Sequence, residues 1–340
     1  MGLKSTGYSK KKVRRCRGRR KTAKGGSRAL DSRFNSDKAK NAEIKGMEAA
    51  LNATQAGNVA DIQAALARDA AIKAVNMSNA VDQGRQDIEV GRIGHRDKQE
   101  YKGEVKNNKR NGCGVYKYGE TSVYKGEFKD NKRHGVGVIT TPEYTYEGDW
   151  NNDNMDGYGT YVFSCRDVYN GSHKNDQFDG YGVYTQVNTG ATFKGEYKAD
   201  KKNGYGTYED ETKLHTHSGL YVNDRFVLGR GRLILQDGIY TGDLKNDTGT
   251  GNGKFRYDTG DVYEGRFKKY KKYGPGKLTR HDGTVQEGWW EGDTMKGTIT
   301  YPTGRFEEGY FVLRPPLRQN QADTYSDAST DEADEMLHFM

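Results

Sequence analysis

The chain has 340 residues, of which 33% are hydrophobic and 30% are charged, with 45 Gly, 24 Tyr and only 5 Pro. Ordinary globular domains have an apolar share of roughly 45–50%, counting Gly. The low apolar share argues against a single large globular core, and the composition excludes a collagen and a Pro-rich disordered tract. Abundant aromatic residues together with abundant Gly indicate a thin sheet.

The net charge of +8 is concentrated at the N-terminus. The first 28 residues contain 12 Lys and Arg and no acid, whereas the last 22 residues contain 6 acidic residues and no Lys or Arg. The chain between these segments is nearly neutral. A basic arm on a neutral body indicates an anionic partner, for which nucleic acid, acidic lipid and acidic protein tails are all eligible.

The three cysteines, Cys16, Cys113 and Cys165, have no close spacing. They predict neither a disulfide framework nor a zinc ribbon, and they favour a reducing compartment. No apolar run approaches the roughly 18–20 residues that span a bilayer, and the N-terminus lacks the apolar core of a secretory signal. We expect a soluble or peripherally attached protein.

Residues 1–30 are predicted to form a basic extended arm. The opening "MGLKST" fits the pattern for myristoylation at Gly2. One acyl chain binds a membrane only marginally, whereas a chain followed by a polybasic run would anchor stably. The basic run consists of Lys10, Lys11, Lys12, Arg14, Arg15, Arg17, Arg19, Arg20 and Lys21.

An arm without a lipid stays open as the alternative. Arg makes planar, bidentate contacts to carboxylate or phosphate, so the arm could bind acidic protein tails. Nucleic acid is a less favoured partner, because Tyr8 is the sole aromatic residue in the arm and a single-strand platform needs several.

Residues 31–100 are predicted to be an Ala-rich helical segment. Apolar residues recur there at helical spacing behind a candidate N-cap at Ser36. These residues are Ile44, Met47 and Leu51, followed by Ile62, Leu66 and Ile72. We predict two helices joined near Gly57. Because an open sheet has exposed edges, we expect these helices or a partner to cover one end of it.

A repeat of about 23 residues begins at Tyr101, with lines such as "YKGEF" at Tyr124 and "YEGDW" at Tyr146. A second glycine follows the first by nine residues in most copies, usually as Gly-x-Gly. The residues that define the repeat are Tyr101, Gly103, Gly112, Gly114, Tyr124, Gly126, Gly135, Gly137, Tyr146, Gly148, Trp150, Gly157, Gly159, Tyr169, Gly171, Gly180, Gly182, Phe193, Gly195, Gly204, Gly206, Tyr240, Gly242, Tyr263, Gly265, Gly274 and Gly276.

Each copy is predicted to form a β-hairpin. In "YKGEF" the residues Tyr124, Gly126 and Phe128 fall on one face and the charged residues between them on the other. The polar "KDNKRH" is a connection and "GVGVI" a return strand. Glycine inside a strand marks a place where something large lies against the backbone. We expect the aromatic rings to lie over the glycines, in a seam that continues from hairpin to hairpin.

This repeat resembles that of the MORN family (membrane occupation and recognition nexus), which runs Tyr-x-Gly-x-Trp/Phe, a polar turn and then Gly-x-Gly. The resemblance covers roughly residues 101–310, with departures at His173, His217 and Gln286. It implies a mainly β chain, an elongated antiparallel β-meander of about nine repeats over residues 101–312. A short helical segment and the arm precede this array, and an acidic tail, residues 313–340, follows it.

The resemblance also implies a scaffold, used in cytoskeletal, ciliary or membrane-junction assemblies and sometimes joined to a catalytic domain. The segments outside the array are too short for such a domain, so we predict no enzyme, no cofactor and no small-molecule substrate. The Gly-x-Gly pairs lack the third Gly and the following helix of a phosphate loop. His215 and His217 would share one face of a strand, but no Cys joins them, and no metal site is predicted.

A second basic cluster falls at the turn of the eighth hairpin. It consists of Lys268, Lys269, Lys271 and Lys272 around Tyr270 and Tyr273. A solvated loop is the simpler interpretation, and a further contact for an anionic surface is the other.

The sequence therefore predicts a non-enzymatic scaffold in the cytoplasm, attached through its arm to other proteins of a cytoskeletal, ciliary or axonemal assembly. A peripheral membrane adaptor, anchored through Gly2 and the basic run, is the first alternative. A structural protein of a large particle such as a viral capsid is the second.

Overall fold

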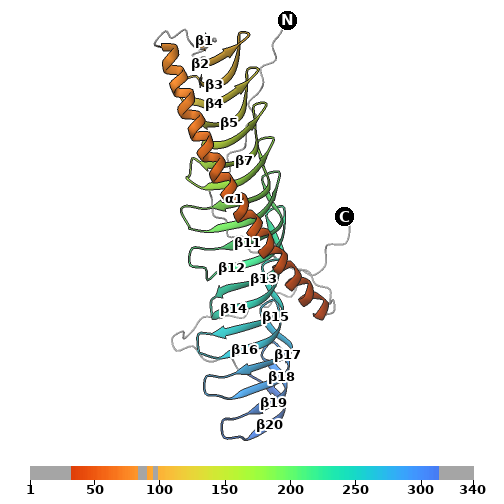
Figure 1. Cartoon of the computed structure of the whole chain (residues 1–340). Coiled ribbons are helices and arrows are strands. Elements are labelled where there is room, and N and C mark those ends of the chain that lie inside the picture. The colour runs from red at the N-terminus through yellow and green to blue at the C-terminus, as the bar shows by residue number, and fades with distance from the viewer. Residues whose placement is uncertain (1–31, 83–89, 95–98, 314–340) are drawn as a thin grey trace, which may run out of the picture. The chain divides into compact units, whose positions relative to one another are not determined.

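The computed structural model describes residues 32–82, 90–94 and 99–313. The described residues form one helix, α1 (Ser32–Asp82), and twenty β-strands (Figure 1). The strands are β1 (Val90–Gly94), β2 (Gln99–Lys106), β3 (Lys109–Tyr118), β4 (Ser122–Lys129), β5 (Lys132–Thr140), β6 (Tyr144–Asn151), β7 (Asn154–Phe163), β8 (Val168–Lys174), β9 (Gln177–Thr185), β10 (Thr192–Lys198), β11 (Lys201–Glu209), β12 (Thr216–Val222), β13 (Arg225–Leu235), β14 (Gly238–Lys245), β15 (Thr248–Tyr257), β16 (Val262–Lys268), β17 (Lys271–Thr279), β18 (Val285–Glu291), β19 (Thr294–Thr300) and β20 (Phe306–Val312).

The chain divides into two compact units. The first contains Lys38–Ile234 and Asp243–Thr248, and so holds most of α1 and the strands β1 to β13. The second groups Leu235–Gly242 with the chain from Gly249 onward, which includes β15 to β20, and β14 contributes to both. Within each unit every strand pairs antiparallel with the next one along the chain. The predicted antiparallel β-meander is confirmed.

A row of glycines crosses the strands of the first unit. Gly126 in β4 lies opposite Gly114 in β3 on one side and Gly137 in β5 on the other, and the same pairing recurs along the unit. The ring of Tyr124 covers this row, since a Cβ on Gly137 would stand 2.3 Å from the Tyr124 hydroxyl oxygen. The predicted placement of aromatic rings over glycines is confirmed, and it explains why no larger residue fits there.

The acidic residue that follows the first glycine of a repeat explains why a second glycine occurs nine residues after the first. The register shifts between Gly148 and Trp150, a β-bulge that turns the side chain of Asp149 back over β7. One carboxylate oxygen of Asp149 accepts a hydrogen bond from the Tyr158 amide at 2.7 Å. The carboxylate fills the space where a Cβ on Gly157 would lie, and Gly157 has a φ of +122° that L side chains rarely adopt. The spacing from Gly148 to Gly157 is thus fixed by a bulge and by the carboxylate that stabilises it.

The N-terminal helix differs from the prediction in two respects. The helix is long and continuous, so the prediction of two helices joined near Gly57 was wrong, and Ser36 lies inside α1 rather than at its cap. Gly57 is buried in the packed side of the helix, where a Cβ would stand 3.3 Å from a methyl carbon of Val183. A glycine in mid-helix costs about 1 kcal/mol relative to alanine, and at this position it lets the helix pack closely on Val183.

α1 covers a face of the sheet and not one end of it. It lies across the strands of the first unit (Figure 1), with Glu43 bonded to Arg230 of β13 and Ile72 beside Lys125 of β4. The strand β1, which the sequence did not predict, pairs antiparallel with β2 before the first repeat. The first unit therefore has three layers: an aromatic layer, the sheet and the helix.

Candidate interaction surface

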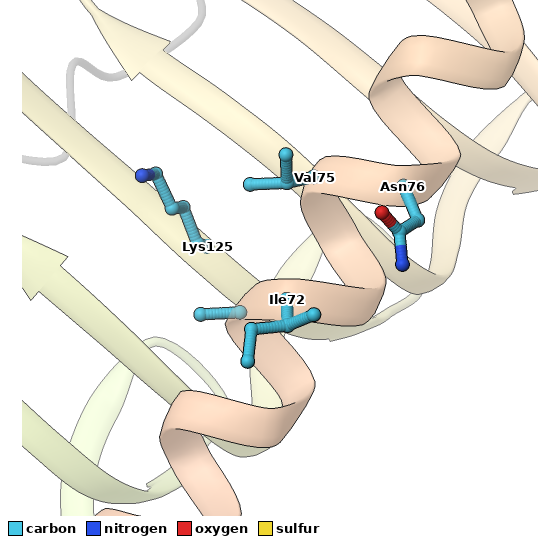
Figure 2. A pocket seen from close by; sticks show the side chains of 5 residues that line it. Ile72, Val75, Asn76 and Lys125 are labelled. Carbon is cyan, nitrogen blue, oxygen red and sulfur yellow. The ribbon is translucent and has the colours of Figure 1, made fainter.

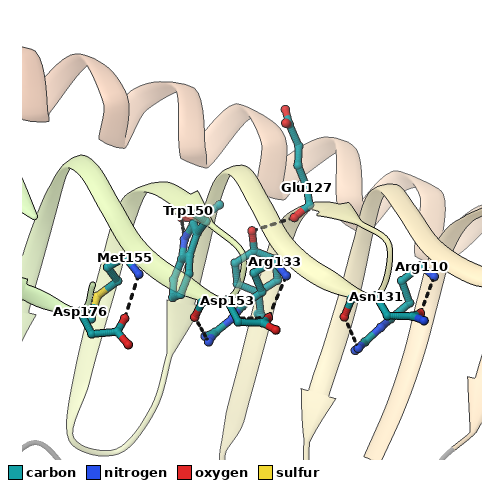
Figure 3. Close-up of polar contacts among 10 residues, drawn as sticks. Arg110, Glu127, Asn131, Arg133, Trp150, Asp153, Met155 and Asp176 are labelled. Atoms are coloured by element: carbon teal, nitrogen blue, oxygen red, sulfur yellow. Dashed lines mark hydrogen bonds and ion pairs between the residues drawn. The ribbon is translucent and has the colours of Figure 1, made fainter. Parts of the chain in front are cut away.

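Each hairpin turn of the first unit is bonded to the turn of the preceding hairpin (Figure 3). The Asp153 carboxylate accepts a hydrogen bond from the Arg133 amide at 2.9 Å, and the Asp153 amide donates to the Arg133 carbonyl at 3.0 Å. Asn131 forms the same reciprocal pair with Arg110. The acceptor in the three turns that follow is Asp176, Asp200 and Asp224. We call this series of contacts the turn ladder.

The turn residues that carry the ladder have left-handed backbone conformations. Asn152 and Asp153 have φ values of 51° and 73°, which is the geometry of a two-residue type I′ turn. Asn and Asp tolerate this geometry better than other side chains, and they also supply the acceptor. The same two residues therefore close one hairpin and fix its distance from its neighbour.

Aromatic rings form a continuous spine on the face opposite α1. The ring of Tyr124 meets both Phe128 and Trp150 edge-to-face, with centroids 5.1 Å and 5.3 Å apart. The Tyr124 hydroxyl donates to the Glu127 carbonyl at 3.0 Å, and burial raises the pKa of this tyrosine well above its usual value. The guanidinium of Arg133 stacks 4.1 Å from the Trp150 ring centroid. Such pairs add stability beyond their buried area, so the spine stiffens the array.

His217 takes the place of the opening aromatic in the sixth repeat. Its ring stacks on Tyr208 and meets Phe226 edge-to-face, with centroids 5.1 Å and 4.7 Å apart. Burial, and to a lesser degree the charge of Lys202, lowers the pKa of His217 to about 3. The histidine is thus a neutral member of the spine, and no group of three metal-ligating side chains occurs among the described residues.

The helix meets the sheet through small residues. Together with the buried Gly46, its buried alanines recur every three or four residues, and they are Ala39, Ala42, Ala49, Ala53, Ala56, Ala60, Ala64, Ala67, Ala70 and Ala74. One turn of helix rises about 5.4 Å, close to the roughly 4.8 Å between strands. About one small residue therefore meets each strand, and the helix can approach the sheet backbone closely.

Polar contacts fix α1 along the sheet. Arg68 pairs with Glu147 of β6 at 2.5 Å, and Asp61 accepts a hydrogen bond from Asn170 of β8 at 3.1 Å. Near its N-terminal end, Glu43 pairs with Arg230 of β13 at 3.3 Å. These contacts set the register of the helix against the strands.

The large apolar side chains of α1 point away from the sheet. These side chains are 38–61% exposed, and they belong to Ile44, Met47, Leu51, Val59, Ile62, Leu66 and Ile72. The sequence identified six of these seven by their helical spacing, but this spacing marks the solvent side of the helix. We call the first six of these residues, from Ile44 to Leu66, the outer face. An apolar row of this length on a solvent-exposed helix indicates an interaction surface.

A shallow pocket lies where α1 passes over β4 (Figure 2). It is lined by Ala71, Ile72, Val75, Asn76 and Lys125, and it contains no acid, no nucleophile and no histidine.

The second basic cluster is divided by the structure. Lys272 is largely buried, with its amine 4.7 Å from the Trp290 ring centroid and 3.3 Å from a carboxylate oxygen of Asp293. Tyr270 packs edge-to-face on Tyr240. The exposed cations of the cluster are Lys268, Lys269 and Lys271. Lys272 is thus held against Trp290 and Asp293, and three lysines are presented to solvent.

The arm cations from Lys10 to Lys21, the lipidation candidate Gly2 and the acidic tail from residue 314 lie outside the described residues. The predictions made for them stay predictions. Of the helices in the described part of the chain, none is long and apolar enough to cross a membrane.

Comparison with known proteins identifies the repeat. Seven segments match the family model described as MORN repeat: residues 101–121, 124–145, 146–164, 169–190, 193–212, 240–262 and 263–285. The copies that begin at His217 and Gln286 are not matched, although β12 and β13 and then β18 and β19 form the same hairpins there.

No curated protein matches the chain. One similar solved structure is a complex from Drosophila melanogaster of the SAS-4 (dCPAP) TCP domain with a proline-rich motif of Ana2 (dSTIL). It is 11% identical, with a TM-score of 0.19, and the match covers 66% of this chain and 90% of that one.

Proposed function

The chain belongs to the MORN-repeat family, and from this premise we propose that it is a non-enzymatic scaffold that holds partner proteins at fixed positions within a larger assembly. The observation that carries the proposal is the turn ladder. Reciprocal bonds such as that between Arg133 and Asp153 join every hairpin of the first unit to its neighbour. A sheet fixed in this way resists bending, and repeat arrays bind partners along extended surfaces.

We propose a cytoplasmic, cytoskeletal or ciliary setting in which the basic arm provides the attachment. Acidic protein tails, such as those on microtubules, suit an Arg-rich arm that carries 12 cations in its first 28 residues. The alternative favoured by a specific observation is a peripheral membrane adaptor, since the "MGLKST" opening and the polybasic run together form a two-signal anchor.

Cosedimentation of the full chain with microtubules and, separately, with anionic liposomes tests the proposal. The matched variant replaces the nine cations from Lys10 to Lys21 by Gln. We expect the native chain to pellet with microtubules, less so as salt rises, and the variant to stay in solution. Arm-dependent pelleting with liposomes alone would support the adaptor instead. Pelleting that is indifferent to the variant would contradict attachment through the arm.

A further inference from the structure

The outer face of α1 contains two sets of apolar residues with identical spacing. Ile44, Met47 and Leu51 follow the pattern i, i+3, i+7, and Val59, Ile62 and Leu66 repeat it fifteen residues later. All six side chains are exposed while the alanines between them are buried against the sheet. Neither set is needed to hold the helix on the sheet. Packing within one chain therefore does not explain the repetition.

The two sets exchange places when the helix is turned end to end. A two-fold axis at Gln55 places Ile44 opposite Leu66 of a second copy and Leu51 opposite Val59. Met47 then falls opposite Ile62, to within one residue. Large side chains would meet at every level of such an antiparallel pair, as they do in packed helix pairs.

Two outward charges agree with the same arrangement. Lys40 and Asp69 are exposed residues just beyond the two apolar sets, one at each end. The axis at Gln55 brings Lys40 of one copy opposite Asp69 of the other to within one residue, and symmetry makes this contact twice. In a parallel pair Lys40 would instead meet Lys40, and Asp69 would meet Asp69, which is repulsive.

We propose that the outer face of α1 binds the same face of a second copy of this chain, antiparallel about Gln55. The contact extends from Lys40 to Asp69, about 44 Å of helix at 1.5 Å per residue. It leaves the sheets on the two outer sides, so α1 would be buried on both of its faces. The dimer would double the number of sheet surfaces and arms that the scaffold offers.

The first experiment measures the mass of the full chain in solution by sedimentation velocity over a concentration series. We expect a reversible monomer–dimer equilibrium. The variant Leu51→Gln/Leu66→Gln should weaken it by at least about tenfold, because it removes apolar contacts at four places in the dimer. Ile72→Gln is the matched control, since Ile72 is 60% exposed on the same helix but lies beyond the paired sets, and it should leave the equilibrium unchanged.

Charge reversal tests the orientation. Lys40→Glu and Asp69→Lys should each weaken the dimer, and the double variant Lys40→Glu/Asp69→Lys should restore it, because the pair is re-formed with opposite polarity. A zero-length carbodiimide cross-link between Lys40 and Asp69 gives a direct readout. These residues lie too far apart along one helix to react within a single copy.

A chain that is monomeric at every concentration would overturn the proposal and assign the outer face to a partner of another sequence. A dimer that is unaffected by Leu51→Gln/Leu66→Gln would also overturn it, by locating the contact elsewhere. A dimer that loses stability with each single reversal and further stability with the double one would rule out the antiparallel orientation.

Discussion

A Cβ atom placed on Gly46 of α1 would stand 2.6 Å from the amide nitrogen of Gly219 in β12. The carbonyl oxygen of Gly206 in β11 lies 3.1 Å from the same point. Both neighbours are backbone atoms of strands that pair with each other, so they cannot move aside as a flexible side chain would. At this point the helix and the sheet touch backbone to backbone.

Replacing Gly46 by Ala is expected to lower the free energy of unfolding. Overpacking costs about 1–3 kcal/mol, and the better helix propensity of Ala returns only about 1 kcal/mol of this. We expect a net loss of up to about 2 kcal/mol, together with faster amide hydrogen exchange in the part of α1 around Gly46. Chemical denaturation and hydrogen exchange measure the two effects.

Gly57→Ala is the matched control on the same face of the helix. Its new methyl group would lie 3.3 Å from the side chain of Val183, which can shift by the few tenths of an ångström required. The propensity gain should therefore prevail, and the variant should be neutral or slightly more stable than the native chain. An equal loss in both variants would contradict the role assigned to the backbone contact at Gly46.

The hairpins could be predicted from the sequence, whereas the orientation of α1 could not. The alternation of Tyr124, Gly126 and Phe128 is local, and a period of two specifies which side of a strand is buried. For α1 the bulky Ile44 and Leu51 look like the core side, yet they are exposed because the sheet backbone admits only small residues. The signal that could have revealed this was the recurrence of alanine every three or four residues. The missed strand β1 is only five residues long and contains no aromatic residue.

The turn ladder predicts a specific effect at Asp153. Asp153→Ala leaves the Arg133 amide without its side-chain acceptor. It also places an alanine, which has no polar side chain to stabilise a left-handed turn, at a φ of 73°. We expect a loss of about 1–3 kcal/mol in the free energy of unfolding, as for other lost hydrogen bonds of buried or strained groups. Hydrogen exchange at the Arg133 amide should rise in this variant.

Asp153→Asn separates the hydrogen bond from the charge. Asn131 already fills the equivalent place in the preceding turn, where its side-chain oxygen accepts from the Arg110 amide at 2.8 Å. We therefore expect Asp153→Asn to keep most of the stability and the slow exchange of the Arg133 amide. If Asn proves as harmful as Ala, then the ion pair between Arg133 and Asp153 at 3.4 Å matters more than the ladder.

His217 makes the first unit sensitive to acid. Its pKa in the folded chain is about 3, against about 6.5 when unfolded. Between these values the unfolded chain binds more protons, so stability falls as the pH is lowered from about 6.5 toward about 3. The slope attributable to this residue is at most about 1.4 kcal/mol per pH unit.

His217→Tyr restores the opening residue of the other repeats and removes this titration. We expect the native chain to lose more stability than the variant when the pH is lowered from 7 to 5, by up to about 2 kcal/mol. Denaturation curves at the two pH values provide the comparison. Identical pH dependence in the two proteins would mean that the buried histidine does not control acid sensitivity.

Lys272 is predicted to act on stability while its neighbours act on binding. Its amine lies over Trp290 and beside Asp293, in a largely buried position where a cation–π contact contributes about 1–2 kcal/mol. Lys272→Ala should therefore lower the free energy of unfolding of the second unit by that amount, and Lys271→Ala, which removes an exposed neighbour, should not.

Reversing Lys268, Lys269 and Lys271 to Glu should leave stability nearly unchanged and reduce binding to anionic liposomes or microtubules, if this cluster contributes to either. Binding that depends on Lys272 but not on these three would contradict the division of the cluster, because a side chain held between Trp290 and Asp293 has little surface left for a partner.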